Sequence, residues 1–278
     1  MKIHFTKMSG AGNDFVVVDN RSNIIQDRLK FAQQVCNRRL GIGADGLLLV
    51  ENSSLADFTM RYFNADGSDG GMCGNGGRCI AQFSFLTKVV STNKFKFDCL
   101  DYIYNAFVES DGSVKLNMKN PLGIRFNEVI AVNGIDLNTH FINTGSPHCI
   151  IFLDENPTLA IDLESVEVVK FGREIRYKLD LYPKGTNVNF VAVAAANSIA
   201  VRTYERGVED ETLACGTGSI GSAIMSSLVQ KTNQPINVFV KSGEILEVGF
   251  SKNPSDEITN VILKGSAKVT FKGEFELD

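Results

Sequence analysis

Two stretches of this sequence share one pattern: Cys73-Gly-Asn-Gly-Gly-Arg-Cys-Ile-Ala81 and Cys215-Gly-Thr-Gly-Ser-Ile-Gly-Ser-Ala223. Both read Cys-Gly-X-Gly followed by four residues and an alanine, and apolar residues at helical spacing continue each of them. About half of the chain length separates the two stretches. Each pattern predicts a helix that begins directly after a cysteine, and the pair predicts one structural unit that occurs twice.

A second parallel lies upstream of each predicted helix. Gly12-Asn-Asp-Phe15 and Gly145-Ser-Pro-His148 both lead into a predicted strand, again about half a chain apart. A helix is predicted over 27–38, and Asn120-Pro-Leu-Gly123 is the expected junction of the halves. The other predicted elements are short strands rich in β-branched and aromatic residues, over 3–8, 15–19, 47–51, 58–63, 95–108 (a hairpin pair), 114–118, 149–153, 188–194, 199–204, 238–240, 245–250 and 258–263. The last strand, 268–275, is expected to return to the first half.

Length and composition exclude several classes of protein. The 278 residues correspond to about two domains, and 44% of them are apolar and 22% charged, as in globular proteins. A net charge of −4 without blocks of like charge argues against nucleic-acid and membrane-surface binding, and no apolar run is long enough to span a bilayer. The amino terminus, MKIHFTK, does not read as a signal peptide, so we expect a cytoplasmic protein.

The six cysteines are expected to be reduced thiols, because a long chain without a signal sequence is not typical of disulfide-stabilised proteins. Three histidines without ligand-like spacing predict no metal site. Four cysteines lie in apolar patterns and are expected to be packing residues: Cys36, Cys79, Cys99 and Cys149. Cys73 and Cys215 are left as candidates for chemistry.

A cysteine just before a helix has a distinctive environment. The first backbone N–H groups of a helix have no intrahelical acceptor, and together with the helix dipole they lower the pKa of a nearby thiol. The same N–H groups bind carboxylates or phosphates, and glycines let a ligand approach the backbone. Two such thiols around one small anionic substrate suit proton removal from one face of a carbon and delivery to the other. The pattern therefore favours a racemase or epimerase.

Other interpretations of the same residues are open at this point. Each cysteine also fits a buried structural residue beside a glycine turn, and Glu205-Arg206 fits a surface ion pair. His148 fits an ordinary loop histidine. Asparagines in Gly/Asp-rich stretches are commonly turn formers, which applies to Asn13, Asn64 and Asn75. A hydrolase that pairs one of the two cysteines with His148 is a different function class, and a non-catalytic anion-binding protein is a third.

The sequence resembles the diaminopimelate epimerase family over essentially its whole length. The likeness rests on motifs in the same order: Lys7-Met-Ser-Gly-Ala-Gly-Asn-Asp-Phe15, Gly41-Ile-Gly-Ala-Asp-Gly46, Phe63-Asn-Ala-Asp-Gly-Ser68, Met72-Cys-Gly-Asn-Gly-Gly-Arg-Cys79, Gly145-Ser-Pro-His148, Gly185-Thr-Asn-Val-Asn-Phe190, Tyr204-Glu-Arg-Gly207 and Glu211-Thr-Leu-Ala-Cys-Gly-Thr-Gly218. So many collinear motifs make an accidental likeness very improbable.

The resemblance implies an α/β fold of two pseudo-symmetric domains, each a curved, mostly antiparallel sheet wrapped around a central helix. The expected domains are 1–118 plus 264–278, carrying Cys73, and 119–263, carrying Cys215, with the active site in the cleft between them. The implied enzyme is an isomerase that interconverts LL- and meso-diaminopimelate without cofactor or metal, on the lysine and peptidoglycan-precursor pathway. A homodimer is expected, with no nucleic-acid or membrane partner.

The resemblance also carries residue roles. It makes Cys73 and Cys215 the acid–base pair, and it makes His148 and Glu205 residues that support the thiols or the substrate ammonium. The positions that match those holding the carboxylate at the reacting centre are Gly74, Asn75, Gly216 and Thr217. The positions that match those holding the other polar groups of the substrate, mostly at its distal end, are Asn13, Asn64, Asn187, Glu205 and Arg206.

Three departures from the family pattern concern fine substrate specificity. Ser146, counted among the substrate-binding residues, stands where many members carry an asparagine; Gly46 replaces a glutamine of some members; and the loop 207–212 is one residue longer than in some relatives. The nearest rival functions are a proline or hydroxyproline racemase, another amino-acid racemase and a phenazine-biosynthesis-like isomerase. The set Asn64, Asn187 and Glu205-Arg206 favours a long substrate with a second amino-acid end.

Overall fold

The computed structural model describes residues 2–255 and 257–276. The chain divides into two compact units, Met1–Asn117 with Lys264–Asp278 (the first unit) and Met118–Leu263 (the second unit). Within the described ranges, no helix is both long and apolar enough to cross a membrane.

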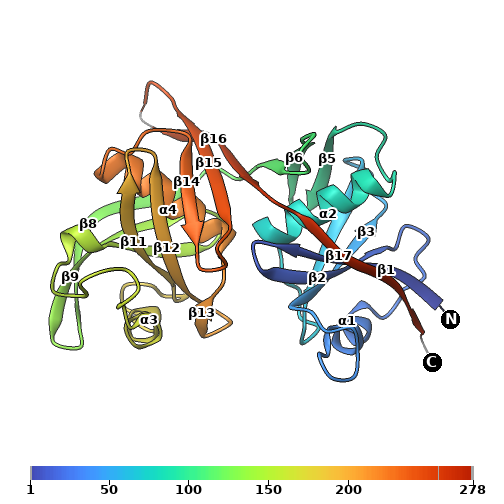
Figure 1. The fold of residues 1–278 in the computed structure, drawn as a ribbon, viewed down its shortest axis with the longest axis horizontal. Coiled ribbons are helices and arrows are strands. Elements are labelled where there is room, and N and C mark those ends of the chain that lie inside the picture. Colours follow the sequence, from blue (N-terminus) through green and yellow to red (C-terminus); the bar gives the residue numbers. More distant parts are fainter. Residues whose placement is uncertain (1, 256, 277–278) are drawn as a thin grey trace. The chain divides into compact units, whose positions relative to one another are not determined.

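The first unit is built on a twisted sheet whose strands follow one another mostly in antiparallel fashion (Figure 1). Two neighbouring pairs, β2–β3 and β4–β5, are parallel. In spatial order the strands are β17 (Lys268–Glu276), β1 (Lys2–Gly10), β2 (Asn13–Asp19), β3 (Gly46–Glu51), β4 (Phe58–Asn64), β5 (Lys94–Cys99), β6 (Tyr102–Val108) and β7 (Val114–Asn117). Since β17 pairs with β1, the predicted return of the last strand to the first half is confirmed.

The second unit has a sheet of the same kind. Its parallel pairs are β10–β11 and β12–β14, and the antiparallel pairs include β8–β9, β9–β10, β11–β12, β12–β13 and β14–β15. The strands are β8 (Leu122–Val132), β9 (Ile135–Asn143), β10 (Pro147–Phe152), β11 (Asn187–Ala195), β12 (Ser198–Glu205), β13 (Asp210–Thr212), β14 (Ile236–Val240), β15 (Ile245–Lys252) and β16 (Ile258–Gly265).

The two sheets repeat one succession of pairings. From β1 in the first unit and from β9 in the second, neighbouring strands pair antiparallel, parallel, antiparallel, parallel and antiparallel. Even the strand before this series matches, because β17 lies beside β1 as β8 lies beside β9. The structure therefore confirms the duplicated unit that the two cysteine motifs predict.

One buried helix occupies the centre of each unit. In the first unit it is α2 (Gly74–Leu86), whose residues are buried from Gly74 to Ser84, and in the second it is α4 (Gly216–Val229). The α4 sequence is small or apolar around the whole helix, which is typical of a helix with no face toward solvent, whereas α2 also buries the polar residues Asn75, Arg78 and Gln82. Strands from several parts of each sheet contact the helix of that unit. The predicted class, a mostly antiparallel sheet around a central helix, is confirmed.

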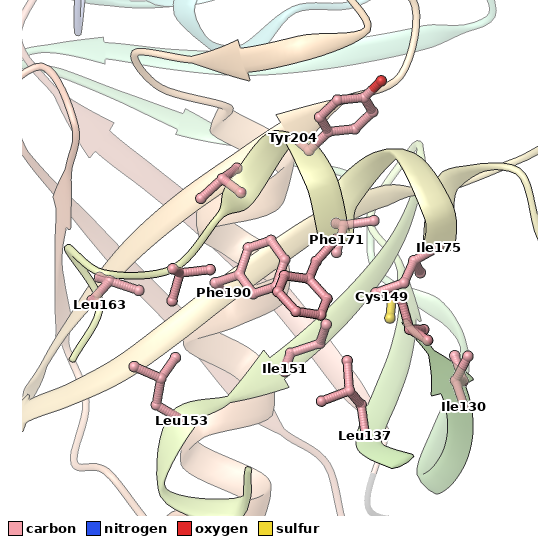
Figure 2. Packing of buried hydrophobic residues seen from close by; sticks show 14 of the residues in the cluster. Ile130, Leu137, Cys149, Ile151, Leu153, Leu163, Phe171, Ile175, Phe190 and Tyr204 are labelled. Carbon is pink, nitrogen blue, oxygen red and sulfur yellow. The ribbon is translucent and has the colours of Figure 1, made fainter. Parts of the chain in front are cut away.

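A second, outer helix covers the opposite face of each sheet. These helices are α1 (Arg28–Cys36), which Asp27 caps by accepting a hydrogen bond from the Lys30 backbone, and α3 (Val168–Arg176). Figure 2 shows Phe171 of α3 directed onto Phe190 and Ile151 of the sheet, and Ile175 lies in the same cluster of buried side chains. Each sheet is therefore packed on both faces, which fixes the strand ends that carry the site.

Four elements of the second unit, β8, β9, α3 and β13, have no counterpart among the predicted ones. The β8–β9 hairpin lies where only a junction was expected, and α3 and β13 were not predicted. The pattern of β8 is hidden because most of its side chains are exposed and its pairing with β9 shifts register twice. In α3, two valines begin the helix and a glycine lies at its middle, and these residues lower its helix propensity.

Candidate active site

Cys73 lies where its motif places it, at the amino end of the central helix of the first unit. It is the N-cap residue of α2, with extended backbone angles, and the Gly76 backbone N–H donates to its sulfur at 3.5 Å. The N–H groups of the first helical turn and the helix dipole favour negative charge at this point. The position therefore suits a thiol that ionises during a reaction, and the Cys73 side chain is only partly buried.

Asn13, the first residue of β2, faces Cys73 with a defined orientation. Its Nδ2 donates to Asp45 Oδ2 at 2.6 Å, so its Oδ1 is the atom directed toward Cys73 Sγ, at 3.7 Å. The thiol of Cys73 donates to that oxygen. Asn13 therefore contacts the Cys73 sulfur and is more than a turn residue, and its role in substrate binding stays a prediction.

A cluster of charges holds this end of β2 in place. The Asp14 carboxylate forms ion pairs with Lys7 at 2.6 Å and with Arg38 at 2.8 Å, and Arg38 also pairs with Asp45 at 2.7 Å. Burial would raise the pKa of Asp14, but the hydrogen bonds from Arg38 and Lys7 outweigh it and lower the pKa to about 2. The Asp14 carboxylate therefore stays ionised at neutral pH, and through Arg38 the cluster anchors Asp45, the partner of Asn13.

The other first-unit candidates differ in their contacts. Asn75 lies within α2 and not in a turn; it is buried, and its Oδ1 accepts from the guanidinium of the wholly buried Arg78 at 3.0 Å. Asn64 closes a turn, because its backbone N–H and its Nδ2 donate to the carbonyl and the hydroxyl of Ser68. These contacts are those of a turn-forming asparagine, and the role of Asn64 in substrate binding stays a prediction.

Cys215 holds the equivalent position in the second unit. It is the N-cap residue of α4, also with extended backbone angles, and its side chain is buried. The hydroxyl of Thr217, two residues on, lies 3.5 Å from the Cys215 sulfur. The two motifs of the sequence thus form the same local structure, a cysteine followed by the first turn of a buried helix.

His148 connects β10 to this helix end. It is fully buried within β10, so the alternative interpretation as a loop histidine is wrong. Its Nε2 lies 2.9 Å from Ser146 Oγ and 3.0 Å from Thr217 Oγ1, and these hydroxyls are 3.0 Å apart. Burial, and to a lesser degree the charge of Arg206, lower the pKa of His148 to about 3, so the ring is neutral at physiological pH.

Two strand ends bring the remaining second-unit candidates close to Ser146. Asn187, at the start of β11, donates from Nδ2 to the Pro147 carbonyl at 2.9 Å and to Ser146 Oγ at 3.4 Å. Its Oδ1 accepts from the Arg206 backbone N–H at 2.8 Å, directly after the end of β12. The structure therefore groups Ser146, His148, Asn187, Arg206 and Thr217 around the amino end of α4.

Glu205 and Arg206 point to different surroundings. A carboxylate oxygen of Glu205 accepts from the Thr212 hydroxyl at 2.9 Å, and the Arg206 guanidinium donates to the Lys184 carbonyl at 3.0 Å. Arg206 also lines a pocket of about 480 Å³ in the second unit, whose wall includes Arg125, Asn143 and Lys184. A pocket lined by Lys184 and Arg206, together with Arg125, which also pairs with Glu128 at 2.7 Å, suits an anionic group of a ligand.

One site residue was quoted in a motif but given no role by the sequence analysis. Asn189 is fully buried on β11, and its Nδ2 lies 3.1 Å from His148 Nδ1. The signal that points to it is spacing, because residues two apart on a strand share a face and Asn189 follows Asn187 by two.

Glycines of the motifs are required by close contacts. A Cβ at Gly218 would lie less than 3.0 Å from Asn189 Oδ1, and one at Gly10 would lie 2.9 Å from the Asn75 carbonyl oxygen. Gly46, a departure from the family pattern, has the same explanation, because a Cβ there would overlap the ring of Tyr62. The longer loop 207–212 is held by Glu209, which accepts from the Gly207 N–H and from Arg176.

The remaining cysteines match their predicted packing role, since all four are buried: Cys36, Cys79, Cys99 and Cys149. Burial raises the pKa of Cys36 to about 12 and that of Cys149 to about 11, so neither thiol ionises readily. Within 2–255 and 257–276, no group of three or more His, Cys, Asp or Glu residues is arranged to hold a metal ion.

Sequence comparison gives relatives that share nearly the whole chain. The family model described as diaminopimelate epimerase matches residues 5–122 and 140–268. The diaminopimelate epimerase of Chlorobaculum tepidum is 42% identical over 275 residues, which cover 97% of this chain and 100% of that protein. The one of Aquifex aeolicus is 41% identical over 285 residues, covering 98% of this chain and 97% of that protein.

Solved structures with low sequence identity share the fold. A phenazine biosynthesis protein of the PhzF family from Bacillus anthracis superposes with a TM-score of 0.75 at 15% identity, and both chains are covered completely. A hydroxyproline epimerase from Agrobacterium vitis, with bound trans-4-hydroxy-L-proline, has a TM-score of 0.74 at 12% identity, covering 100% of this chain and 93% of that one.

Proposed function

The chain belongs to the diaminopimelate epimerase family, and from this premise we propose that it interconverts LL- and meso-diaminopimelate without a cofactor, with Cys73 and Cys215 as the two acid–base groups. The observation that carries the proposal is that both cysteines are N-cap residues of the buried central helices of two equally built units. A single cysteine at a helix end is unremarkable, but the same position occupied twice fits a reaction that needs two equivalent bases.

The chemistry explains why such helix ends are useful. The α-proton of an amino acid is a very weak acid, so the carbanion formed by its removal needs strong preorganised stabilisation. Without an electron-accepting cofactor, helix N-termini directed at the substrate carboxylate supply much of this stabilisation. We assign this role to the first turns of α2 and α4, through Gly74, Asn75, Gly216 and Thr217.

The two thiols exchange roles in each turnover. One starts as a thiolate and removes the α-proton, while the other starts as a thiol and delivers its proton to the opposite face of the carbon. The reverse reaction uses them in the opposite sense, because the product leaves the first cysteine protonated and the second ionised. This mechanism requires both sulfurs to reach the same α-carbon during turnover, and the two units are then half-site domains carrying one base each.

The distal end of the substrate is assigned to polar groups of both sequence halves. We propose that Asn13, Asn64, Asn187, Glu205 and Arg206 hold the second amino-acid group, with Ser146 contributing a hydroxyl. Arg206 is supported by the pocket that it lines together with other cations. A shorter amino acid would leave these polar groups unpaired, which is an effective basis for selectivity.

A hydrolase that uses a Cys215–His148 pair is less well supported. His148 Nε2 contacts the hydroxyls of Ser146 and Thr217, and Thr217 in turn lies beside the Cys215 sulfur. The imidazole is thus one residue removed from the thiol instead of serving as its direct base. We further propose the cellular setting of the family: a cytoplasmic homodimer on the lysine and peptidoglycan-precursor pathway.

Conversion of pure LL-diaminopimelate, followed by chiral chromatography, tests the proposal. Cys73→Ser and Cys215→Ser are each expected to abolish epimerisation, whereas Cys36→Ser, a buried cysteine of the first unit, is the matched control and should remain active. A proline and hydroxyproline arm tests the rival racemases. Full activity of either catalytic variant, or conversion of proline instead of diaminopimelate, would refute the assignment.

A further inference from the structure

The ring of His148 is held between two sets of contacts of different chemistry. On one side, Nδ1 lies 3.1 Å from Asn189 Nδ2, and on the other, Nε2 faces the hydroxyls of Ser146 and Thr217. A hydroxyl can donate or accept, so the hydroxyl side alone does not determine which ring nitrogen carries the proton. The contacts of the Asn189 amide determine which ring nitrogen carries the proton.

The orientation of the Asn189 amide is fixed by two neighbours. Its Nδ2 donates to the Cys149 carbonyl at 3.1 Å, and its Oδ1 accepts from the Thr203 hydroxyl at 2.9 Å. Because a backbone carbonyl only accepts, the amide group that faces it must be the NH₂. The same NH₂ group faces His148, so Nδ1 is the acceptor and the single proton of the neutral ring lies on Nε2.

This proton placement gives the surrounding hydrogen bonds one direction. The Nε2–H donates to the hydroxyl pair, and Asn187 Nδ2 also donates to Ser146 Oγ at 3.4 Å. The His148 and Asn187 N–H groups therefore donate to the oxygens of Ser146 and Thr217. One hydroxyl hydrogen of this pair is then left to donate to a further acceptor. Cys215 Sγ, 3.5 Å from Thr217 Oγ1, is the acceptor at that end.

We propose that Asn189 is a positioning residue that holds His148 as the Nε2–H tautomer, so that the Thr217 hydroxyl donates to the Cys215 thiolate. The inference rests on the proposed function in one respect, the role of Cys215 as an acid–base group. Asn189 acts through His148 and Thr217 and touches neither the sulfur nor a substrate. With the tautomer reversed, Nε2 would accept a hydroxyl hydrogen and compete with the sulfur for it.

Two further observations support this role. The second glycine of the Cys215 motif, Gly218, leaves space that Asn189 Oδ1 fills, so the first turn of α4 packs directly on the amide. Asn189 and His148 are both fully buried, and Thr203 is 4% exposed. With water excluded, no solvent molecule substitutes for the amide, and the neutral form of the ring is enforced by burial.

Nitrogen NMR of the full-length protein reads the tautomer directly. The chain has three histidines, so ¹⁵N-histidine labelling gives three ring systems, and His148→Gln identifies the signals of His148. Protonated and unprotonated ring nitrogens resonate in well-separated ranges. We expect a protonated Nε2 and an unprotonated Nδ1 in the wild type between pH 5 and 8. A proton on Nδ1 of the wild-type protein, or a charged ring at pH 7, would by itself overturn the inference, without any variant.

Three variants test the part played by Asn189. Asn189→Asp offers a carboxylate that accepts from Nδ1–H and should reverse the tautomer, and the neutral Asn189→Ala should give a mixture. Thr203→Val keeps Asn189 but removes the hydroxyl that donates to its Oδ1. Asn156 is the matched control: it is buried in the same unit, and its Nδ2 donates to the carbonyls of Asn138 and Phe152. Asn156→Asp should leave the ring signals of His148 unchanged.

The link to the sulfur is tested by alkylation, which needs no assumption about the substrate. Iodoacetamide is reacted with the protein at a series of pH values, and peptide mapping follows the rate at Cys215. Loss of a hydrogen bond to a charged group should slow this reaction roughly 10- to 100-fold at pH 7, most in Asn189→Asp and also in Asn189→Ala. Asn156→Asp should not change it. An unchanged Cys215 profile in a variant with reversed tautomer would refute the link.

The outcome separates this inference from the proposed function. Two results support the role of Asn189: the wild type carries its proton on Nε2 of His148, and variants that lose this tautomer are alkylated more slowly at Cys215. Both results hold even for a protein that fails to convert diaminopimelate. Active enzyme with a proton on Nδ1 overturns the inference and leaves the proposed function intact. In active enzyme, Asn189→Asp should lower kcat more than it raises KM, because Asn189 does not bind the substrate.

Discussion

Adding one methyl group at Gly218 has a predictable and unusual effect. Gly218 is the second glycine of the Cys215 motif, in the first turn of α4. Replacing a helical glycine by alanine usually stabilises a protein, by up to about 1 kcal/mol, because alanine has the higher helix propensity. We expect the opposite sign for Gly218→Ala.

The contacts of the added Cβ determine the size of the effect. It would lie less than 3.0 Å from Asn189 Oδ1 and 3.3 Å from both Cys215 Cβ and His148 Cε1. Asn189 cannot swing away without losing its bonds to Thr203 and Cys149. Overpacking of a filled core costs about 1–3 kcal/mol, and a contact closer than 3.0 Å with a fixed side chain argues for about 2–3 kcal/mol, which exceeds the gain in helix propensity. We therefore expect a net loss of about 1–2 kcal/mol in the free energy of unfolding.

The duplicated unit supplies a matched control. Gly76 holds the equivalent place in the Cys73 motif, but a Cβ there would have no neighbour closer than Leu48 Cδ2 at 3.2 Å, with Met60 Cε and Phe15 Cε1 at the ordinary contact distance of 3.5 Å. Urea unfolding of both variants is the assay, and Gly76→Ala should remain within about 1 kcal/mol of the wild type. A Gly218→Ala variant as stable as the wild type would show that the Asn189 side chain is not fixed as described.

Three further predictions concern cofactor, substrate and pH. Purified protein should keep its full epimerase activity after exhaustive chelation and carbonyl-reagent treatment; activity restored only by an added metal or cofactor would contradict the two-thiol mechanism. Arg206→Ala should cost about 2–4 kcal/mol of transition-state binding, measured as a fall in kcat/KM toward diaminopimelate. The surface variant Arg21→Ala should not change kcat/KM, and unchanged kinetics of Arg206→Ala would remove Arg206 from the substrate site. The pKa of His148 is lowered from 6.5 to about 3, so between these two pH values the unfolded chain takes up a proton that the folded chain does not. Between pH 7 and pH 4.5 this should cost about 2.5 kcal/mol of stability, and His148→Gln should be less acid-sensitive in urea unfolding; equal sensitivity would contradict a buried neutral ring.

The fold was largely predictable because its main signals are local. Alternating β-branched residues identify strands such as β2 and β3, and the two Cys-Gly-X-Gly motifs identify the starts of α2 and α4. The duplication then follows from the distance between the motifs. Elements without a local signal were missed: β8 is mostly exposed, and α3 contains Gly172, a poor helix former that is needed there because a Cβ would overlap Tyr204.

The site was predictable in its residue types but not in its hydrogen bonds. Cys73 and Cys215 stand out from their helix-start motifs, and the family resemblance points to the residues around them. The direction of the Asn13 amide depends on Asp45, and the tautomer of His148 depends on Asn189 and Thr203. These contacts join strands that are distant in sequence, so no local pattern reveals them. His148 shows the difference plainly: its position after a proline suggests a loop, but the structure buries it in a strand.

Hydrogen–deuterium exchange at the α-carbon tests the two-base mechanism most directly. Each thiol carries a single exchangeable proton, so in heavy water the proton removed from the substrate stays on one sulfur while the other delivers a deuteron. LL-diaminopimelate is incubated with the enzyme in heavy water, and both isomers are analysed by mass spectrometry at low conversion. We predict that the newly formed meso isomer carries one deuterium and that the remaining LL isomer carries none. A meso product without deuterium would mean that one group removes and returns the same proton, and would contradict the assignment of Cys73 and Cys215 as a pair.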